Sequence, residues 1–120
     1  MRWLVDGMNV IGSRPDGWWR DRRAAMRRLV GDLERLEGDV TVVLDGAAFE
    51  LESDPVEVVF ASRRGPNAAD DDIAARVAAD PDPGSLTVVT SDADLERRVR
   101  EHGVSVEGAG RFRRRLDDEP

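Results

Sequence analysis

The chain has 120 residues, no cysteine and a formal net charge of −7. A chain of this length is expected to fold as one domain around a single hydrophobic core. The absence of cysteine excludes thiol catalysis and thiolate metal sites, and the absence of lysine excludes Schiff-base chemistry and a P-loop lysine. The negative charge argues against a protein that coats nucleic acid by bulk electrostatics.

The periodicity of apolar residues predicts alternating strands and helices. In the first half of the chain it predicts a strand at residues 2–6, a loop at 7–17 and an amphipathic helix at 18–37 that ends at Gly38. Two further strands are predicted at 39–45 and 56–61. In the second half it predicts a helix at residues 67–80, a strand at 86–90 and a helix at 91–103. A short strand at 104–106 and one docked helical turn at 112–116 follow.

Apolar strands with little alternation, separated by helices, indicate a largely parallel sheet that is covered on both faces. The predicted fold is therefore an α/β three-layer sandwich with a central, mainly parallel sheet of about five strands. We expect one domain over residues 1–116 and a tail over 117–120. Without a visible signal peptide or a membrane-spanning apolar run, the protein is expected to be soluble and cytoplasmic.

Four acidic residues recur at one kind of place in the predicted fold. Asp6, Asp45 and Asp92 each follow an apolar strand, and Asp70 opens a helix. The carboxyl ends of parallel strands meet at one edge of a sheet, where such sheets bind ligands. Converging carboxylates repel one another unless a cation lies between them, and oxygen ligands suit Mg²⁺ or Mn²⁺. The pattern predicts a metal-dependent nuclease.

The first two of these acids also have a structural interpretation, because Asp-Gly is a strong turn signal. For Asp6 we favour a functional role, since a carboxylate at the end of a strand expected at the centre of the sheet is costly to desolvate without a partner. For Asp45 the turn and the site are equally good interpretations. Asn9, in the same D-G-x-N motif as Asp6, either bonds the local backbone or belongs to the site.

The helix-start acids have a rival interpretation as capping residues. Asn67 is a good N-cap and Asp70 is then its capping-box partner, while Ser91 can cap the next helix with Asp92 in its first turn. Asp94 follows Asp92 at a spacing that can aim two carboxylates around one metal. Each acid alone is as consistent with a helix start as with a ligand, and together they favour the site.

Basic and aromatic residues suggest how a substrate is held. Arg63 and Arg64 lie just upstream of Asp70 and are better placed to hold phosphates than the arginines of the first predicted helix. Trp18 and Trp19 can stack on bases, although packing on the core is the favoured interpretation.

Four segments together resemble the NYN domain, specifically its YacP-like branch within the PIN-like nuclease fold. They are DGMNVIG at 6–12, VVLDG at 42–46, NAADDDI at 67–73 and VVTSDADL at 88–95. The resemblance implies a Mg²⁺ or Mn²⁺ site and single-stranded RNA as substrate. It also implies a role in RNA processing or turnover, with ribosome-bound mRNA as a partner.

By motif match, the resemblance implies a catalytic set and, with Asp45 beside it, a metal set; we also expect a substrate-binding set next to these acids. The catalytic set is Asp6, Asn9, Asp70, Asp92 and Asp94. The metal set is Asp6, Asp45, Asp70, Asp92 and Asp94, and the substrate-binding set is Arg63, Arg64, Asn67 and Ser91. The alternatives are a non-catalytic RNA- or ribosome-binding module and a Toprim-like domain. A Toprim-like domain has glutamate after its first strand, where this chain has Asp6.

Overall fold

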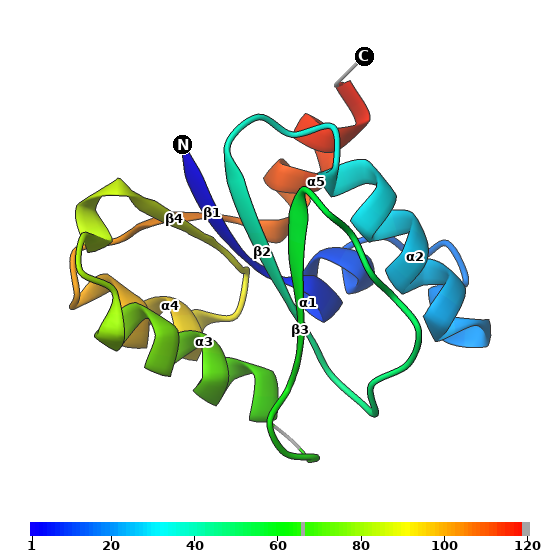
Figure 1. The fold of residues 1–120 in the computed structure, drawn as a ribbon, viewed down its shortest axis with the longest axis horizontal. Helices are drawn as coiled ribbons and strands as arrows, with labels where there is room; N and C mark the ends of the chain where they lie inside the picture. Colours follow the sequence, from blue (N-terminus) through cyan, green and yellow to red (C-terminus); the bar gives the residue numbers. More distant parts are fainter. Residues whose placement is uncertain (66, 119–120) are drawn as a thin grey trace.

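A computed structural model describes residues 1–65 and 67–118 as one five-stranded parallel sheet between two layers of helices (Figure 1). The strands are β1 (Arg2–Asp6), β2 (Asp39–Leu44), β3 (Val56–Phe60), β4 (Leu86–Val89) and β5 (Ser105–Glu107). The helices are α1 (Gly7–Gly12), α2 (Arg22–Leu33), α3 (Ala68–Ala79), α4 (Ala93–Arg100) and α5 (Ala109–Asp118), with short 3₁₀ helices η1 (Trp18–Arg20) and η2 (Pro83–Ser85). The predicted fold class is confirmed.

The sheet separates two hydrophobic cores, and successive residues of β1 contribute to opposite ones. Trp3 and Val5 pack with residues of α1, α2 and α5, whereas Leu4 packs with residues of α3 and α4. Figure 1 shows α1, α2 and α5 on one side of the sheet and α3 and α4 on the other. Across the part of the chain that the structure describes, no helix is long and apolar enough to cross a membrane.

The strand order β3-β2-β1-β4-β5 places β1 at the centre of the sheet. The chain moves outward from β1 to β3 on one side and then crosses to β4 and β5 on the other. At such a switch in direction, the connections that leave neighbouring strands go to opposite faces, which opens a crevice at the carboxyl edge. That edge carries Asp6 at the end of β1 and the segment that leads from β4 into α4.

The prediction of a loop over residues 7–17 is wrong for its first part, because α1 begins directly after β1. Val10 and Ile11 are buried in the core beneath α2 and α5. A helix this short has little stability of its own, so tertiary packing of those two side chains decides its conformation. Asp6 and Gly7 therefore form a strand-to-helix junction and not a turn between strands.

Gly7 is required by the close approach of α1 to β2. A Cβ atom built on Gly7 lies 2.5 Å from Leu44 Cδ2 and 3.0 Å from the Val43 carbonyl oxygen. Leu44 is fully buried, so its side chain has no room to withdraw. We expect Gly7→Ala to lower the free energy of unfolding by about 1–3 kcal/mol, measured by urea denaturation.

Gly31, inside α2, is the matched control, because nothing lies within 4 Å of a Cβ built there. Gly31→Ala is expected to stabilise the protein by roughly 0.4–1 kcal/mol through the unfolded chain's lower entropy. Equal effects of the two substitutions would contradict the steric argument.

Three other helix boundaries differ from those predicted. The helix predicted over 18–37 is divided into η1 and α2, because Asp21 adopts an extended conformation and caps α2 by accepting from the Ala24 N–H at 3.0 Å. α2 ends at Leu33, so residues 34–38 form turns and not a continuation to Gly38. The single turn predicted near the end of the chain is the ten-residue helix α5, held by Phe112 and Leu116, both fully buried.

The predicted domain boundary at residue 116 stays a prediction. α5 continues past it to Asp118, and residues 119 and 120 of the predicted tail lie outside the described residues.

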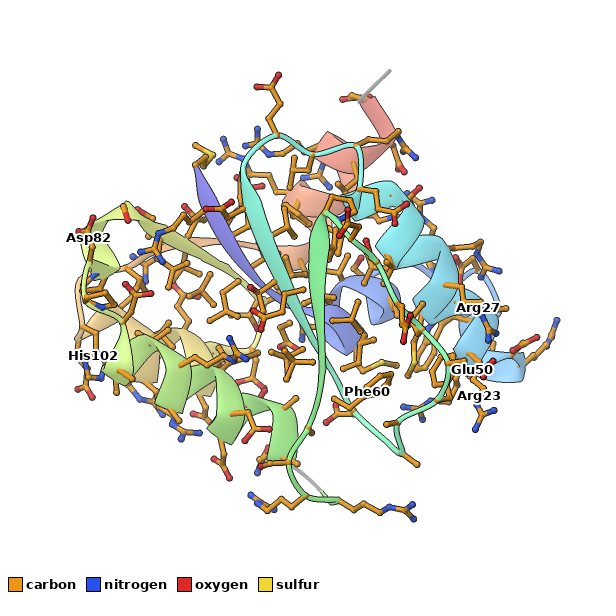
Figure 2. The ribbon with its side chains drawn as sticks, viewed as in Figure 1. Arg23, Arg27, Glu50, Phe60, Asp82 and His102 are labelled. Carbon is orange, nitrogen blue, oxygen red and sulfur yellow. The ribbon has the colours of Figure 1, made fainter. Side chains whose placement is uncertain are left out.

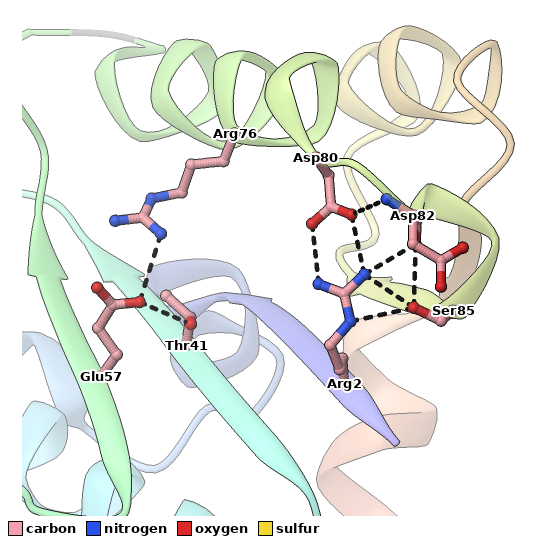
Figure 3. Close-up of polar contacts among 7 residues, drawn as sticks. All are labelled: Arg2, Thr41, Glu57, Arg76, Asp80, Asp82 and Ser85. Atoms are coloured by element: carbon pink, nitrogen blue, oxygen red, sulfur yellow. Dashed lines mark hydrogen bonds and ion pairs between the residues drawn. The ribbon is translucent and has the colours of Figure 1, made fainter.

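A polar network joins the far end of α3 to the amino end of the sheet (Figure 3). The Arg2 guanidinium donates two hydrogen bonds of 2.9 Å to the Asp80 carboxylate and also contacts Ser85. This guanidinium lowers the pKa of Asp80 to about 2. Because Asp80 caps the end of α3, the pair fixes the direction of the helix whose opposite end carries Asp70.

Candidate functional site

Asp6 is the last residue of the central strand and is 5% exposed. The Thr90 hydroxyl donates to its Oδ2 atom at 2.9 Å. Burial raises the pKa of Asp6 to about 7, against the opposing effect of the Thr90 hydrogen bond. The carboxylates of Asp70 and Asp45 raise this pKa further, so both lie near enough to repel it.

Thr90 is a site residue that the sequence did not reveal. It directly follows β4, is fully buried, and accepts a hydrogen bond from the Asp92 N–H at 3.1 Å while donating to Asp6. Its hydroxyl thus connects the end of β1 to the start of α4. A threonine at the end of a β-branched run looks like one more strand residue, and only the Ser91-Asp92 pair after it indicated a polar site.

Asp70 lies in the first turn of α3 and is half-buried. Its pKa is raised, first by burial and then by the charges of Asp92 and Asp45, while Arg98 opposes the shift. The capping-box interpretation is wrong, because Asn67 has a left-handed backbone (φ 64°) and its side chain makes no capping hydrogen bond. The placement of Asp70 is thus explained by its neighbours at the sheet edge and not by a capping box.

Asp92 both caps α4 and faces the other acids. Its Oδ1 atom accepts from the Leu95 N–H at 3.0 Å, and its charge raises the pKa of Asp70. The prediction that Ser91 caps this helix is wrong: the Ser91 Oγ atom accepts from the Ala109 N–H at 2.7 Å. Within the described residues, Asp92 Oδ2 accepts no hydrogen bond.

Asp45 and Asn9 complete the set at this edge. Asp45 follows β2 directly, is half-buried, and raises the pKa of both Asp6 and Asp70. The Asn9 side chain, from α1, accepts from the Ser91 N–H through Oδ1 at 2.7 Å. Asn9 therefore fixes the position of the segment that carries Asp92.

Two other predicted residues do not join this group. Asp94 is exposed and pairs with Arg97 of its own helix. Arg63 pairs with Asp71, which also accepts from Arg98 at 3.0 Å, and hydrogen bonds from these two arginines lower the pKa of Asp71.

Arg64 and Asn67, the remaining predicted substrate contacts, are exposed beside the start of α3. Arg98 was not identified from the sequence, yet it is the cation whose charge opposes the raised pKa of Asp70.

The site provides oxygen ligands of the kind that Mg²⁺ and Mn²⁺ prefer. Among residues 1–65 and 67–118, no three carboxylate or imidazole side chains are close enough together to hold a metal ion as they stand. Mg²⁺ usually keeps several waters and takes only one or two protein carboxylates, so this arrangement suits it better than a cation that needs a full protein cage. The mutual repulsion of Asp6, Asp45 and Asp70 is what a cation would relieve.

The protein is thus of the parallel α/β class, with four acidic residues at the carboxyl edge of the sheet, where the strand order changes direction. Its fold is shared with the crystal structure of Rae1 (YacP) from Bacillus subtilis, with a TM-score of 0.75 and 24% identity over 98% of this chain and 74% of that one. A point mutant of Rae1 gives a TM-score of 0.76 and 23% identity over 97% and 74%. No protein-family model and no curated protein matches the sequence.

Proposed function

We propose that this protein is a metal-dependent ribonuclease that hydrolyses phosphodiester bonds in single-stranded RNA. The observation that carries the proposal is the buried Asp6 carboxylate at the end of the central strand, with the charges of Asp45 and Asp70 close enough to raise its pKa. Such strongly perturbed carboxylates at a ligand-binding edge are typical of functional sites.

The choice of RNA as substrate rests on the four segments that resemble the YacP-like branch of the NYN domain. The YacP-like fold of the chain supports that resemblance. We extend the proposal to RNA processing or turnover, with ribosome-bound mRNA as the partner.

In this proposal Asp6, Asp70 and Asp92 hold one or two Mg²⁺ or Mn²⁺ ions, and Asp45 adds negative charge beside them. When bound, a divalent ion lowers the pKa of an attacking water and stabilises the charge that develops on the phosphate. Thr90 holds Asp6 in place through its hydroxyl, and Asn9 holds the chain that carries Asp92. Asp94 stays a predicted ligand that has to leave Arg97 to take part.

Mg²⁺ or Mn²⁺ is expected to raise the melting temperature of the protein at neutral pH. An ion that binds only the folded state stabilises it by RT ln(1 + [L]/Kd), about 2.7 kcal/mol at a hundredfold excess over Kd. Thermal melts across millimolar Mg²⁺ and Mn²⁺, with Asp6→Asn and Asp70→Asn in parallel, test this. A melt of the parent that does not change with metal would count heavily against the site.

The second candidate function is a non-catalytic RNA- or ribosome-binding module. It is favoured by the absence, among the described residues, of three acidic or imidazole groups that converge on one point. The two functions are separated by incubating labelled single-stranded RNA with the protein and Mn²⁺, and with the protein and a chelator. Cleavage that needs the metal supports the ribonuclease, and RNA that is bound but stays intact supports the module.

A further inference from the structure

Five arginines lie on η1 and the first seven residues of α2. They are Arg20, Arg22, Arg23, Arg27 and Arg28. Within the described residues none of them forms an ion pair with a carboxylate, whereas ten other arginines do. A local cationic surface without acidic partners, on a protein of net charge −7, points to an anionic ligand.

Aromatic rings lie between these arginines. The Arg23 and Arg27 guanidinium groups lie 4.8 and 5.0 Å from the centroid of the Phe49 ring, and Phe49 packs edge-on against Phe60 at 5.6 Å. Figure 2 shows Arg23 and Arg27 beside Glu50 on the α2 side of the molecule, with Phe60 nearer the sheet. Arg27 donates to the Glu50 backbone carbonyl at 3.2 Å, which fixes this loop against α2.

The tryptophan pair extends the same surface. Arg22 lies 5.7 Å from the Trp18 ring centroid and Arg20 lies 5.9 Å from that of Trp19. The favoured interpretation that both tryptophans pack on the core holds for Trp18 and is wrong for Trp19, which is 54% exposed. An exposed indole beside a guanidinium offers a face on which a nucleobase can stack.

A pocket connects this surface to the acidic site. It has a volume of about 300 Å³ and is lined by Arg22, Arg23, Met26, Asp45, Gly46, Ala47 and Phe49. Asp45, in its wall, is the residue whose charge raises the pKa of both Asp6 and Asp70. A nucleic-acid strand with one nucleotide in this pocket therefore passes directly beside Asp6, Asp45 and Asp70.

We propose that this arginine–aromatic surface binds the segment of single-stranded RNA next to the bond that is cut, an inference that rests on the proposed function. Arg22 and Arg23 contact phosphates, a base enters the pocket against Phe49, and Trp19 stacks on a further base. Alternating guanidinium groups and rings suit a polymer of phosphates and bases better than an acidic protein surface, which has no bases to stack.

The test measures binding of fluorescein-labelled oligouridylate by fluorescence anisotropy, in chelator and over a series of salt concentrations. Arg22→Gln with Arg23→Gln is expected to weaken binding at least ~tenfold and to reduce the salt slope by about 1.4, at ~0.7 for each phosphate contact. Trp19→Ala is expected to weaken binding roughly tenfold through lost stacking. Thermal melts of each variant show that it is folded.

The matched control is Arg111→Gln with Arg114→Gln, which removes the same charge from exposed arginines of α5 that form no ion pair within the described residues. This control should bind like the parent. Equal losses of affinity in the two double variants would mean that net charge alone explains the effect, and would overturn the proposed RNA-binding surface. A salt slope like that of the parent in Arg22→Gln with Arg23→Gln would overturn it too.

Because the chelator prevents cleavage, the binding result does not depend on hydrolysis. A parent that binds through these arginines but never cuts RNA supports the surface and overturns the ribonuclease. Stronger binding to an acidic peptide than to the oligonucleotide would overturn the RNA assignment.

Discussion

Asp6→Asn is expected to reduce metal-dependent cleavage of single-stranded RNA by roughly 10²-fold or more. Asparagine keeps the shape of the side chain and can still accept the Thr90 hydrogen bond, but it removes the negative charge that a divalent cation needs. Asp92→Asn should have a comparable effect on cleavage. The measurement is the initial rate on a labelled oligonucleotide with Mn²⁺, alongside a thermal melt of the same samples.

Asp54→Asn is the matched control, since Asp54 is exposed in the loop before β3 and forms no ion pair within the described residues. It removes the same charge and should cleave RNA like the parent. Asp92 also caps α4, so Asp92→Asn can lower the stability by about 1 kcal/mol, although asparagine caps nearly as well as aspartate. Parent-like cleavage by both Asp6→Asn and Asp92→Asn would overturn the ribonuclease assignment.

The strands and the edge that carries the acids were predictable because each depends on local sequence. A continuous β-branched run such as residues 40–43 is typical of a strand that is buried on both faces of a parallel sheet. An acid directly after such a run must lie at the carboxyl edge, and this placed Asp6 and Asp45 correctly. The charges that raise the pKa values of Asp6 and Asp70 agree with that placement.

The contacts between distant segments were not predictable from single positions. α1 forms because Val10 and Ile11 are buried under helices that come later in the chain. The pairing of Arg63 with Asp71 depends on how the β3–α3 connection folds back on the helix, and the sequence order does not specify it. The bond from Thr90 to Asp6 likewise joins residues 84 positions apart, through the adjacency of β1 and β4.

The stability of the metal-free protein is expected to fall as pH rises from about 4 to about 7, because of Asp6. Burial raises the pKa of Asp6 from 3.8 to about 7, so over this range the folded state holds a proton that the unfolded chain has released. Stability falls with pH wherever the native state binds more protons. A shift of this size corresponds to a loss of about 4 kcal/mol from this group, at 1.36 kcal/mol for each pH unit.

Asp6→Asn removes the buried charge, so its stability should change less than that of the parent between these pH values. In the chelated protein the variant should match the parent near pH 4 and exceed it by up to about 4 kcal/mol above pH 7, measured by urea denaturation. Asp80→Asn provides a control of opposite sign. Arg2 lowers the pKa of Asp80 to about 2, so the stabilisation from Asp80 is present above about pH 4 and is lost as pH falls toward 2. Parallel pH curves for the parent and Asp6→Asn would mean that Asp6 ionises freely in the folded protein, and the repulsion that a bound cation is proposed to relieve would then be absent.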